Sequence, residues 1–504
     1  MNIIKRECKF VTHLEAIDGV RPDIHLVKER LTYEDGSTAP NLAVIKNFKR
    51  DFYITKPHYQ KYKQKKECED ISRLNKYSAT ESDLGKEACA RLGGYKFVGK
   101  NSLWDAKESP YIYGVEIDSR TILKHYYSVK WPDNFSAYSV AVLDIETNVD
   151  TNEIIVMSVT SNSKVYVGIL ESLLQGRNKV KEQLEYLYKK HIPETDISKN
   201  ITPEFYICKT EPELIKTIIS KTHEIKSDFL AVWNINYDIP YIMERCEHFG
   251  LDIAELFSDP SLPKEYRVFE YKKSQSSRTT ASGVAKIFSP WEQWHVIKTS
   301  ASYYLIDAMC AYYYVRVGAK QVPGGYSLNN ILDFELGSKY KKLKFENLNN
   351  DHSDGIDWHK FMIKNHPLEY VIYNVWDVMS VLELDNKTKD LSYSLPALAG
   401  DSSFDVFKSG PKKITDALHF FYLNKGKVLG TKISKRYLES VLKNKDLYLL
   451  GLDGWVQIMK ASRIRDYGLN VISEDKSLKT AARGHLFDLD KNRFNNIFVH
   501  RVHI

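Results

Sequence analysis

The sequence predicts a mixed α/β protein, α+β overall, with roughly three domains in its 504 residues. Two observations lead to this class. After Ser139, apolar runs of strand length alternate with helical patterns, which is typical of a sheet covered by helices. Before that point, strand-like segments are separated by turn signals such as Asp35-Gly36. The apolar fraction of 43% and the charged fraction of 27% are those of a folded globular chain and exclude extended disorder.

The predicted elements divide the chain into three regions. Residues 1–138 form a β-rich N-terminal domain. Residues 389–504 form the third region, in which the boundary-like segments LPALAGDSS and KSGPK come first and mixed helix and strand follow. The region between them holds strands at 139–146, 153–161, 164–170 and 229–233 and helices at 178–190, 239–249 and 367–384. Within this region, the polar segment KKSQSSRTTASG lies between two β-prone arms and predicts a β-hairpin over about residues 266–294.

Composition indicates a compartment and a class of ligand. No run of 18 apolar residues is present, and the N-terminus lacks the apolar core of a signal peptide, so we expect a cytoplasmic protein without a membrane partner. Six cysteines without Cys-x-x-Cys spacing fit a reducing compartment and argue against a zinc knuckle. Lys and Tyr interleave in DFYITKPHYQKYKQKK, a pattern that suits single-stranded nucleic acid. A solvated Lys-rich loop beside core tyrosines is the alternative.

Two carboxylates stand at the end of the apolar strand VAVLDIET. Asp144 and Glu146 project from the same face, because side chains alternate along a strand. Two carboxylates on one face repel each other unless a cation lies between them. The pair therefore predicts a site for Mg²⁺ or Mn²⁺, which prefer oxygen ligands, with a strand end carrying solvated acids as the alternative.

Two further acids lie at positions of interest. Asp238, in AVWNINYDIPY, follows a second apolar strand at the start of a helix, where it could also act as a cap. Asn234 and Tyr237 beside it are a polar and an aromatic group of the kind that a nucleotide would contact. Asp377 lies one helical turn after Tyr373, so the phenol and the carboxylate project together.

The helix that carries Asp377 has a clear apolar stripe. Val371, Val375, Val378 and Leu382 recur at helical spacing and predict its buried face, with Tyr373 and Asp377 on another face.

These segments resemble the exonuclease motifs of family B DNA polymerases. VLDIET is similar to the first motif (Asp-x-Glu), WNINYD to the second (Asn-x(2–3)-Phe/Tyr-Asp) and YNVWD to the third (Tyr-x-x-x-Asp), in the order of that family. YSLNNILDFEL resembles the segment before the third motif in phage replicative members. DFYITKP and SPYIYGVEID are more loosely similar to the family's N-terminal domain. The resemblance extends from about residue 45 to 490.

The resemblance implies a proofreading 3′→5′ exonuclease on a ribonuclease-H-like sheet, with residues 139–388 as the exonuclease domain. Asp144, Glu146 and Asp377 would hold one divalent ion, and Asp144 and Asp238 would hold a second, the latter largely through waters. Tyr373 would orient the attacking water, and Asn234 and Tyr237 would position the terminal nucleotide of single-stranded DNA or of a primer–template 3′ end. The location would be the host-cell cytoplasm if the source is viral.

The polymerase half of the resemblance is incomplete. GLDGWV, YGLNV and AARGHLFDLD resemble the approach to the first palm motif, which places Asp488 or Asp490 at its acidic position as a partial palm site. KNRFNNIFVHRVHI then stands where Ser-Leu-Tyr-Pro is expected, and neither the Asp-Thr-Asp turn nor the Lys-bearing fingers motif is present. One palm carboxylate cannot hold the two metal ions of nucleotidyl transfer.

Three hypotheses follow. The favoured one is the N-terminal and exonuclease part of a split or truncated polymerase, ending at the start of the palm, with a second polypeptide supplying the rest of palm, fingers and thumb and with replisome proteins as further partners. A stand-alone single-strand DNA exonuclease is the second. A non-catalytic chain that only binds DNA or a replisome partner is the third.

Overall fold

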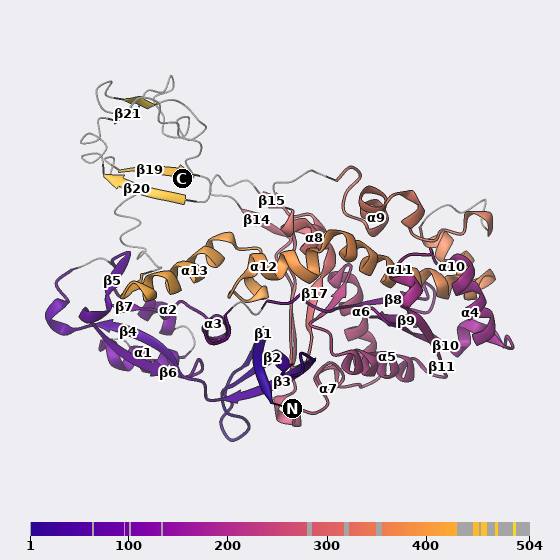
Figure 1. Ribbon diagram of the computed structural model, residues 1–504, viewed down its shortest axis with the longest axis horizontal. Coiled ribbons are helices and arrows are strands. Elements are labelled where there is room, and N and C mark those ends of the chain that lie inside the picture. Colours follow the sequence, from indigo (N-terminus) through magenta and orange to yellow (C-terminus); the bar gives the residue numbers. More distant parts are fainter. Residues whose placement is uncertain are drawn as a thin grey trace. The chain divides into compact units, whose positions relative to one another are not determined.

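The computed structural model describes residues 2–489 apart from residues 63–64, 95, 100–101, 133–134, 280–284, 317–321, 349–354, 431–446, 453–454, 461–468 and 472–486. Two compact units emerge from its internal contacts. The first consists of residues 1–48 and 120–408, and the second of residues 49–119 and 409–504. Both units combine helices with sheets (Figure 1). The mixed α/β class that the sequence predicts is therefore confirmed.

A six-stranded mixed sheet forms the centre of the first unit. Its strand order is β11-β10-β9-β8-β12-β17. The strands are β8 (Val140–Thr147), β9 (Ile154–Thr160), β10 (Lys164–Leu170), β11 (Thr202–Cys208), β12 (Phe229–Val232) and β17 (Tyr304–Asp307). β9 runs antiparallel to both of its neighbours, whereas β8, β12 and β17 run parallel to one another. The parallel strands are almost continuously apolar because both of their faces are covered.

Two helices cover this sheet. Figure 1 shows the strands between α5 (Glu211–Ile225) and α11 (Pro367–Thr388), both of which contact β9 and β10. Gly168 of β10 lets α5 approach closely, since a Cβ atom there would lie 2.8 Å from Cγ1 of Ile218. The predicted helices at 178–190 and 239–249 correspond to α4 (Val180–His191) and α6 (Ile235–His248). α6 begins four residues earlier than predicted, which brings Asp238 into its first turn.

α11 is buried more completely than its apolar stripe predicts. Every residue from Pro367 to Asp385 except Glu369 is buried, including Tyr373 and Asp377. The reason is that α11 contacts the sheet together with α4, α9 (Leu328–Leu336) and α10 (Ile356–Asn365). The prediction of a single buried face was therefore wrong, and the polar residues of this helix face a protein interior.

The N-terminal residues of the first unit form a three-stranded antiparallel sheet of β1 (Ile3–Leu14), β2 (Ile24–Tyr33) and β3 (Thr38–Lys46). α3 (Ser119–Lys130) packs beside it through Leu123 and Tyr127.

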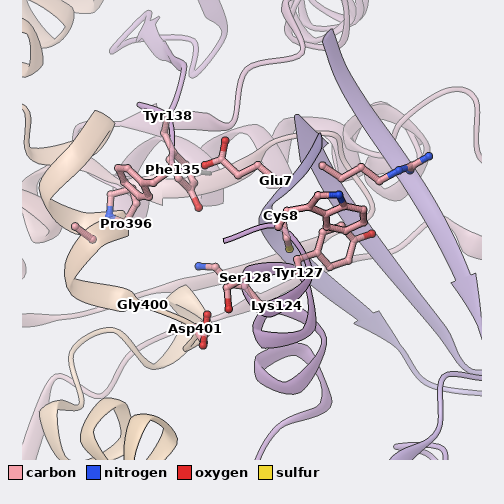
Figure 2. A pocket seen from close by; sticks show the side chains of 13 residues that line it. Glu7, Cys8, Lys124, Tyr127, Ser128, Phe135, Tyr138, Pro396, Gly400 and Asp401 are labelled. Carbon is pink, nitrogen blue, oxygen red and sulfur yellow. The ribbon is translucent and has the colours of Figure 1, made fainter. Parts of the chain in front are cut away.

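A cavity of about 260 Å³ lies between β1, α3 and residues 396–401 (Figure 2). Burial raises the pKa of the Cys8 thiol in its wall to about 12, so this cysteine is an unreactive thiol.

Two short antiparallel pairs occupy the interval of the predicted hairpin. β13 (Phe269–Lys272) pairs with β16 (Val296–Thr299), and β14 (Ser277–Thr279) pairs with β15 (Ala285–Ile287). Residues 280–284 of the predicted polar tip lie outside the described residues. The β14 and β15 side chains are exposed, so this ribbon contributes no core of its own.

The second unit contains a small sheet of β4 (Arg50–Thr55), β6 (Leu74–Ala79) and β7 (Ile112–Tyr113), with helices α1 (Leu84–Leu92), α2 (Ser102–Lys107) and α13 (Gly410–Asn424). β5 (Cys68–Asp70) pairs with β18 (Lys427–Leu429). The Lys- and Tyr-rich stretch is partly used inside this unit. Lys65 pairs with Glu116 at 2.8 Å, and the Tyr62 hydroxyl lies 2.8 Å from Oγ1 of Thr55.

Further short elements complete the architecture. They are α7 (Ile253–Phe257), α8 (Ala308–Val315), α12 (Leu395–Ala399), β19 (Leu447–Leu452), β20 (Trp455–Lys460), β21 (Leu469–Val471) and β22 (Phe487–Leu489).

The two units divide the chain at points other than 138/139 and 388/389, so the three domains expected from the sequence stay predictions. Within the described ranges, no helix has both the length and the hydropathy needed to cross a membrane.

Candidate active site

Three of the four predicted acids converge where β8 meets α11. One carboxylate oxygen each of Asp144, Glu146 and Asp377 lies within 4.8 Å of the other two. Asp144 and Glu146 extend from the same face of β8, as the strand period requires. Asp377 comes from α11, 231 positions after Glu146 in the chain, and reaches them because this helix packs directly on β8.

One stripe of α11 faces these carboxylates. Tyr370, Tyr373, Asn374 and Asp377 follow one another at helical spacing. The Tyr370 hydroxyl donates to Oε2 of Glu146 at 2.6 Å, and Nδ2 of Asn374 donates to Oδ2 of Asp144 at 2.7 Å. The helix therefore holds both strand acids in fixed rotamers while presenting its own carboxylate to them.

Lys342 supplies the positive charge nearest to this group of acids. Its Nζ forms an ion pair with Oδ2 of Asp377 and donates to the Tyr373 hydroxyl at 3.0 Å. Although burial alone lowers the pKa of a lysine, the charges of Asp377, Tyr373 and Asp144 raise the pKa of Lys342 well above its usual value. Lys342 is thus a permanently charged partner for both Tyr373 and Asp377.

The carboxylates disfavour ionisation of one another. Burial raises the pKa of Asp144 well above its usual value, and the charges of Asp238, Asp377 and Glu146 raise it further. Burial and the charge of Asp377 likewise raise the pKa of Glu146 to about 7. The pKa of Asp377 is raised by burial despite the opposing effect of Lys342. A divalent cation would relieve this repulsion.

Asp238 lies close to the three acids without joining their closest group. It is buried in the first turn of α6, and its charge is the strongest electrostatic influence on the pKa of Asp144. Asp307 at the end of β17 fixes this helix start, because Oδ2 accepts the Ile235 N–H at 3.0 Å and Oδ1 accepts the Cys310 N–H at 2.7 Å. The fourth acid is therefore placed by a neighbouring parallel strand.

The two predicted nucleotide contacts lie beside Asp238 at the beginning of α6. Asn234 occupies the N-cap position, where its carbonyl oxygen accepts the Tyr237 N–H at 3.0 Å. Tyr237 is 53% exposed and lies beside Tyr241, with 6.1 Å between ring centroids. The base of the β13–β16 pair is tied to the same helix start, since the Tyr271 hydroxyl donates to Oδ1 of Asn236 at 3.1 Å.

The donor set fits a divalent cation. Oδ1 of Asp377 is buried and has no hydrogen-bond partner among the described residues, so one oxygen of the cluster has its lone pairs available. Three carboxylates supply the hard oxygen donors that Mg²⁺ and Mn²⁺ prefer. Asp144, Glu146 and Asp377 are therefore the residues that could hold such an ion.

The structure describes one of the two predicted palm acids. Asp488 belongs to β22, which pairs with β21 so that Asp488 lies opposite Asn470. Asp490 lies outside the described residues. A partial palm site at these two positions stays a prediction.

Sequence reasoning missed several residues of the site. Tyr370 and Asn374 carry a usable signal, because they fall on the same helical stripe as Tyr373 and Asp377. Asp307 has a weaker one, as an acid directly after an apolar strand. Lys342 has none, because the segment KKLK does not distinguish it from neighbouring lysines.

The comparison with protein families agrees with this geometry. Residues 106–287 match the exonuclease domain of DNA polymerase family B. The chain contains a family B DNA polymerase exonuclease domain. The matched range includes Asp144, Glu146 and Asp238, and the fold adds Asp377 from outside it. No curated protein matches the chain.

The family B match also accounts for the central sheet. A mixed sheet with an antiparallel second strand and parallel strands beyond β8 is the ribonuclease-H-like arrangement that the resemblance implies for this domain. The family B exonuclease domain supports a 3′→5′ exonuclease function and identifies the chain as a nuclease. The acidic group is compatible with the divalent metals that such domains use.

Proposed function

We propose that this chain is the proofreading 3′→5′ exonuclease part of a family B replicative DNA polymerase and removes 3′-terminal nucleotides of DNA by two-metal hydrolysis in the cytoplasm. The observation that carries the proposal is the convergence of Asp144, Glu146 and Asp377, which come from β8 and α11. The match to the family B exonuclease domain supports the same reaction class.

Each residue has a chemical role in this proposal. Asp144, Glu146 and Asp377 would hold one divalent ion, and Asp144 and Asp238 would hold a second, the latter largely through waters. When bound, the ions supply a hydroxide nucleophile near neutral pH and stabilise charge on the leaving oxygen. Tyr373 orients the attacking water through its hydroxyl, and Lys342 fixes that hydroxyl from 3.0 Å.

The start of α6 would receive the terminal nucleotide. Asn234 is polar and partly exposed, and the exposed Tyr237 ring offers a stacking surface for a base. Single-stranded DNA or the frayed 3′ end of a primer–template would thus enter next to Asp238.

The decisive experiment measures degradation of single-stranded DNA labelled at its 5′ end. We expect products shortened one nucleotide at a time from the 3′ end with Mg²⁺ or Mn²⁺, and none in EDTA. The Asp144→Asn variant is the matched control for a contaminating nuclease. Degradation that survives EDTA, or that is equal in Asp144→Asn, would overturn the assignment. An RNA oligonucleotide of the same sequence measures the preference between DNA and RNA.

We further propose that primer extension requires a second polypeptide with the remaining palm, the fingers and the thumb, and that replisome proteins are additional partners. The support is the palm-like sequence up to Asp490 together with the absence of Asp-Thr-Asp and fingers motifs from the 504 residues. The chain alone should shorten a primer without extending it. Extension and co-purification should appear when a polypeptide with those motifs is added. Extension by the chain alone would contradict the proposal, and failure of every such polypeptide would favour a stand-alone exonuclease.

A further inference from the structure

A second group of potential metal ligands lies in the N-terminal sheet, among residues that the exonuclease reaction does not use. His13 of β1 and His25 of β2 are directly paired in the antiparallel register. Asp23 lies two residues before His25, directly before β2 begins. Ligand atoms of all three residues lie within 4.8 Å of one another.

The distances describe a compact donor set. Nε2 of His13 is 2.9 Å from Oδ2 of Asp23, and Nδ1 of His25 is 3.5 Å from Oδ1 of the same carboxylate. The two imidazole centroids are 4.7 Å apart. Donor atoms bound to zinc at about 2.0–2.1 Å lie roughly 3–3.5 Å apart in a tetrahedral site, so small rotations would allow all three to share one ion.

Burial and access also suit a bound ion. Asp23 and His25 are almost fully buried, so their donor atoms are held within the fold. The His13 side chain is 13% exposed, which leaves this side of the group in contact with solvent. The Phe48 ring lies edge-on to His25 at 5.4 Å between centroids, so one side of the group is closed by an apolar wall.

We propose that His13, Asp23 and His25 form a site for a divalent transition metal, with zinc as the ion it takes. Two imidazoles and one carboxylate favour Zn²⁺ and Co²⁺ over Mg²⁺, which prefers oxygen ligands only. This site therefore differs in chemistry from the all-carboxylate group of Asp144, Glu146 and Asp377.

The position of the site indicates a structural role. The ion would join the end of β1 to the start of β2 and close the connection 15–23 between them. Leu14 and Ile24, which are adjacent to His13 and Asp23 in sequence, pack against Leu262 and Tyr266. Arg21 in the connection donates to the carbonyl oxygen of Glu265 at 3.1 Å. The bound ion would thus stabilise the junction between the N-terminal sheet and the segment that leads into β13.

The test uses the full chain carrying Asp144→Asn and Asp377→Asn, so that the exonuclease acids do not contribute. Equilibrium dialysis against Zn²⁺ with excess Mg²⁺ should leave about one zinc ion per chain, and Co²⁺ should give the visible absorption of a low-coordinate nitrogen–oxygen site. Adding His13→Gln should abolish both signals and the zinc-dependent rise in melting temperature. Adding His58→Gln, which changes an exposed histidine, should alter none of them.

His13→Gln is preferred to His25→Gln because His13 is the less buried of the two, and circular dichroism checks that the variant is folded. Zinc binding that is unchanged by His13→Gln, or a parent chain that retains no zinc, would overturn the proposal and show that the three side chains form an ion-pair network only. Exonuclease activity does not enter this readout, so the site can fail while the proposed nuclease function stands.

Discussion

Asp228 and Asp144 are acids at opposite ends of the same two parallel strands. Asp228 directly precedes β12, and Ser139 directly precedes β8, so both lie at the amino ends. Oδ2 of Asp228 accepts the Ser139 N–H at 2.8 Å and pairs with Arg30 at 2.5 Å. Asp144 lies near the carboxyl end of β8, where the charges that affect its pKa most are those of other acids. One end of the strands satisfies its carboxylate and the other end leaves its carboxylates in mutual repulsion.

The difference separates a structural acid from a functional one. At the amino ends, the carboxylate of Asp228 pairs with Arg30 of β2 and accepts hydrogen bonds from the backbone N–H and the hydroxyl of Ser139, which ties β2 to the central sheet. At the carboxyl ends, Lys342 offsets only part of the negative charge and Oδ1 of Asp377 has no partner among the described residues. Open α/β sheets commonly bind ligands at the carboxyl ends of their strands, where such unsatisfied groups can be used.

The largest expected effect is on activity at the carboxyl-end acids. Asp144→Asn keeps the side-chain shape but removes the charge that would hold both ions. Loss of several kcal/mol of transition-state stabilisation corresponds to a fall of roughly 10³-fold or more in single-turnover cleavage. The melting temperature should not fall, because the substitution relieves repulsion. Near-normal cleavage by this variant would contradict the catalytic role of the acids at the carboxyl ends of the strands.

A smaller loss is expected for Tyr373→Phe. The ring and its packing remain, but the hydroxyl that receives the Lys342 hydrogen bond is lost. Positioning groups of this kind contribute about 10²–10⁴-fold, so single-turnover cleavage should slow by about that factor. The Mg²⁺ concentration for half-maximal activity should stay the same. Normal cleavage by Tyr373→Phe at saturating Mg²⁺ would show that Tyr373 contributes packing and does not orient the water.

At the amino ends, Asp228→Ala should affect stability rather than catalysis. The substitution leaves Arg30 without its carboxylate and the Ser139 N–H without its acceptor. Breaking a buried pair costs about 3–5 kcal/mol, and the partial exposure of Arg30 places the expected loss near 3 kcal/mol in urea unfolding. Cleavage measured well below the melting temperature should be unchanged. Asp228→Asn, which keeps an acceptor oxygen, should lose less.

The smallest expected effect is a pH-dependent gain in stability for Glu146→Gln in EDTA. The pKa of Glu146 is about 7 in the fold and 4.5 as the ordinary value, so the folded chain keeps this proton over a range where the unfolded chain has lost it. The stability of the wild type should therefore fall as the pH rises from about 4.5 to 7.

Glu146→Gln should escape that loss. Above pH 7 without metal, the variant should be more stable than the wild type by on the order of 1–2 kcal/mol, and at pH 5 the two should differ little. Thermal melts at both pH values measure this difference. Saturating Mg²⁺ should reverse the order, because the wild-type acids then gain a ligand. If the wild type were more stable than Glu146→Gln in EDTA at pH 8, the inferred repulsion between the carboxylates would be contradicted.

The sequence by itself determined the α/β class, the order of the main strands and helices, and the face on which Asp144 and Glu146 project. These features depend on local periodicity, which the sequence shows as alternation along a strand or as helical spacing. The same periodicity related Tyr373 to Asp377, and it would also have found Tyr370 and Asn374 on the stripe that faces the acids. Local patterns could not show that α11 is buried on all sides, because its neighbours come from distant segments.

Only the tertiary structure decided which acids meet. Asp377 reaches Asp144 and Glu146 because α11 lies on β8, and Lys342 reaches Asp377 from a loop without any sequence signal. The pairing of His13 with His25 likewise depends on strand register, which no spacing along the chain reveals. Burial then sets the chemistry, since the same carboxylates in water would repel weakly and titrate at ordinary pH. Packing distant segments around them raises their pKa values and creates the demand for a cation.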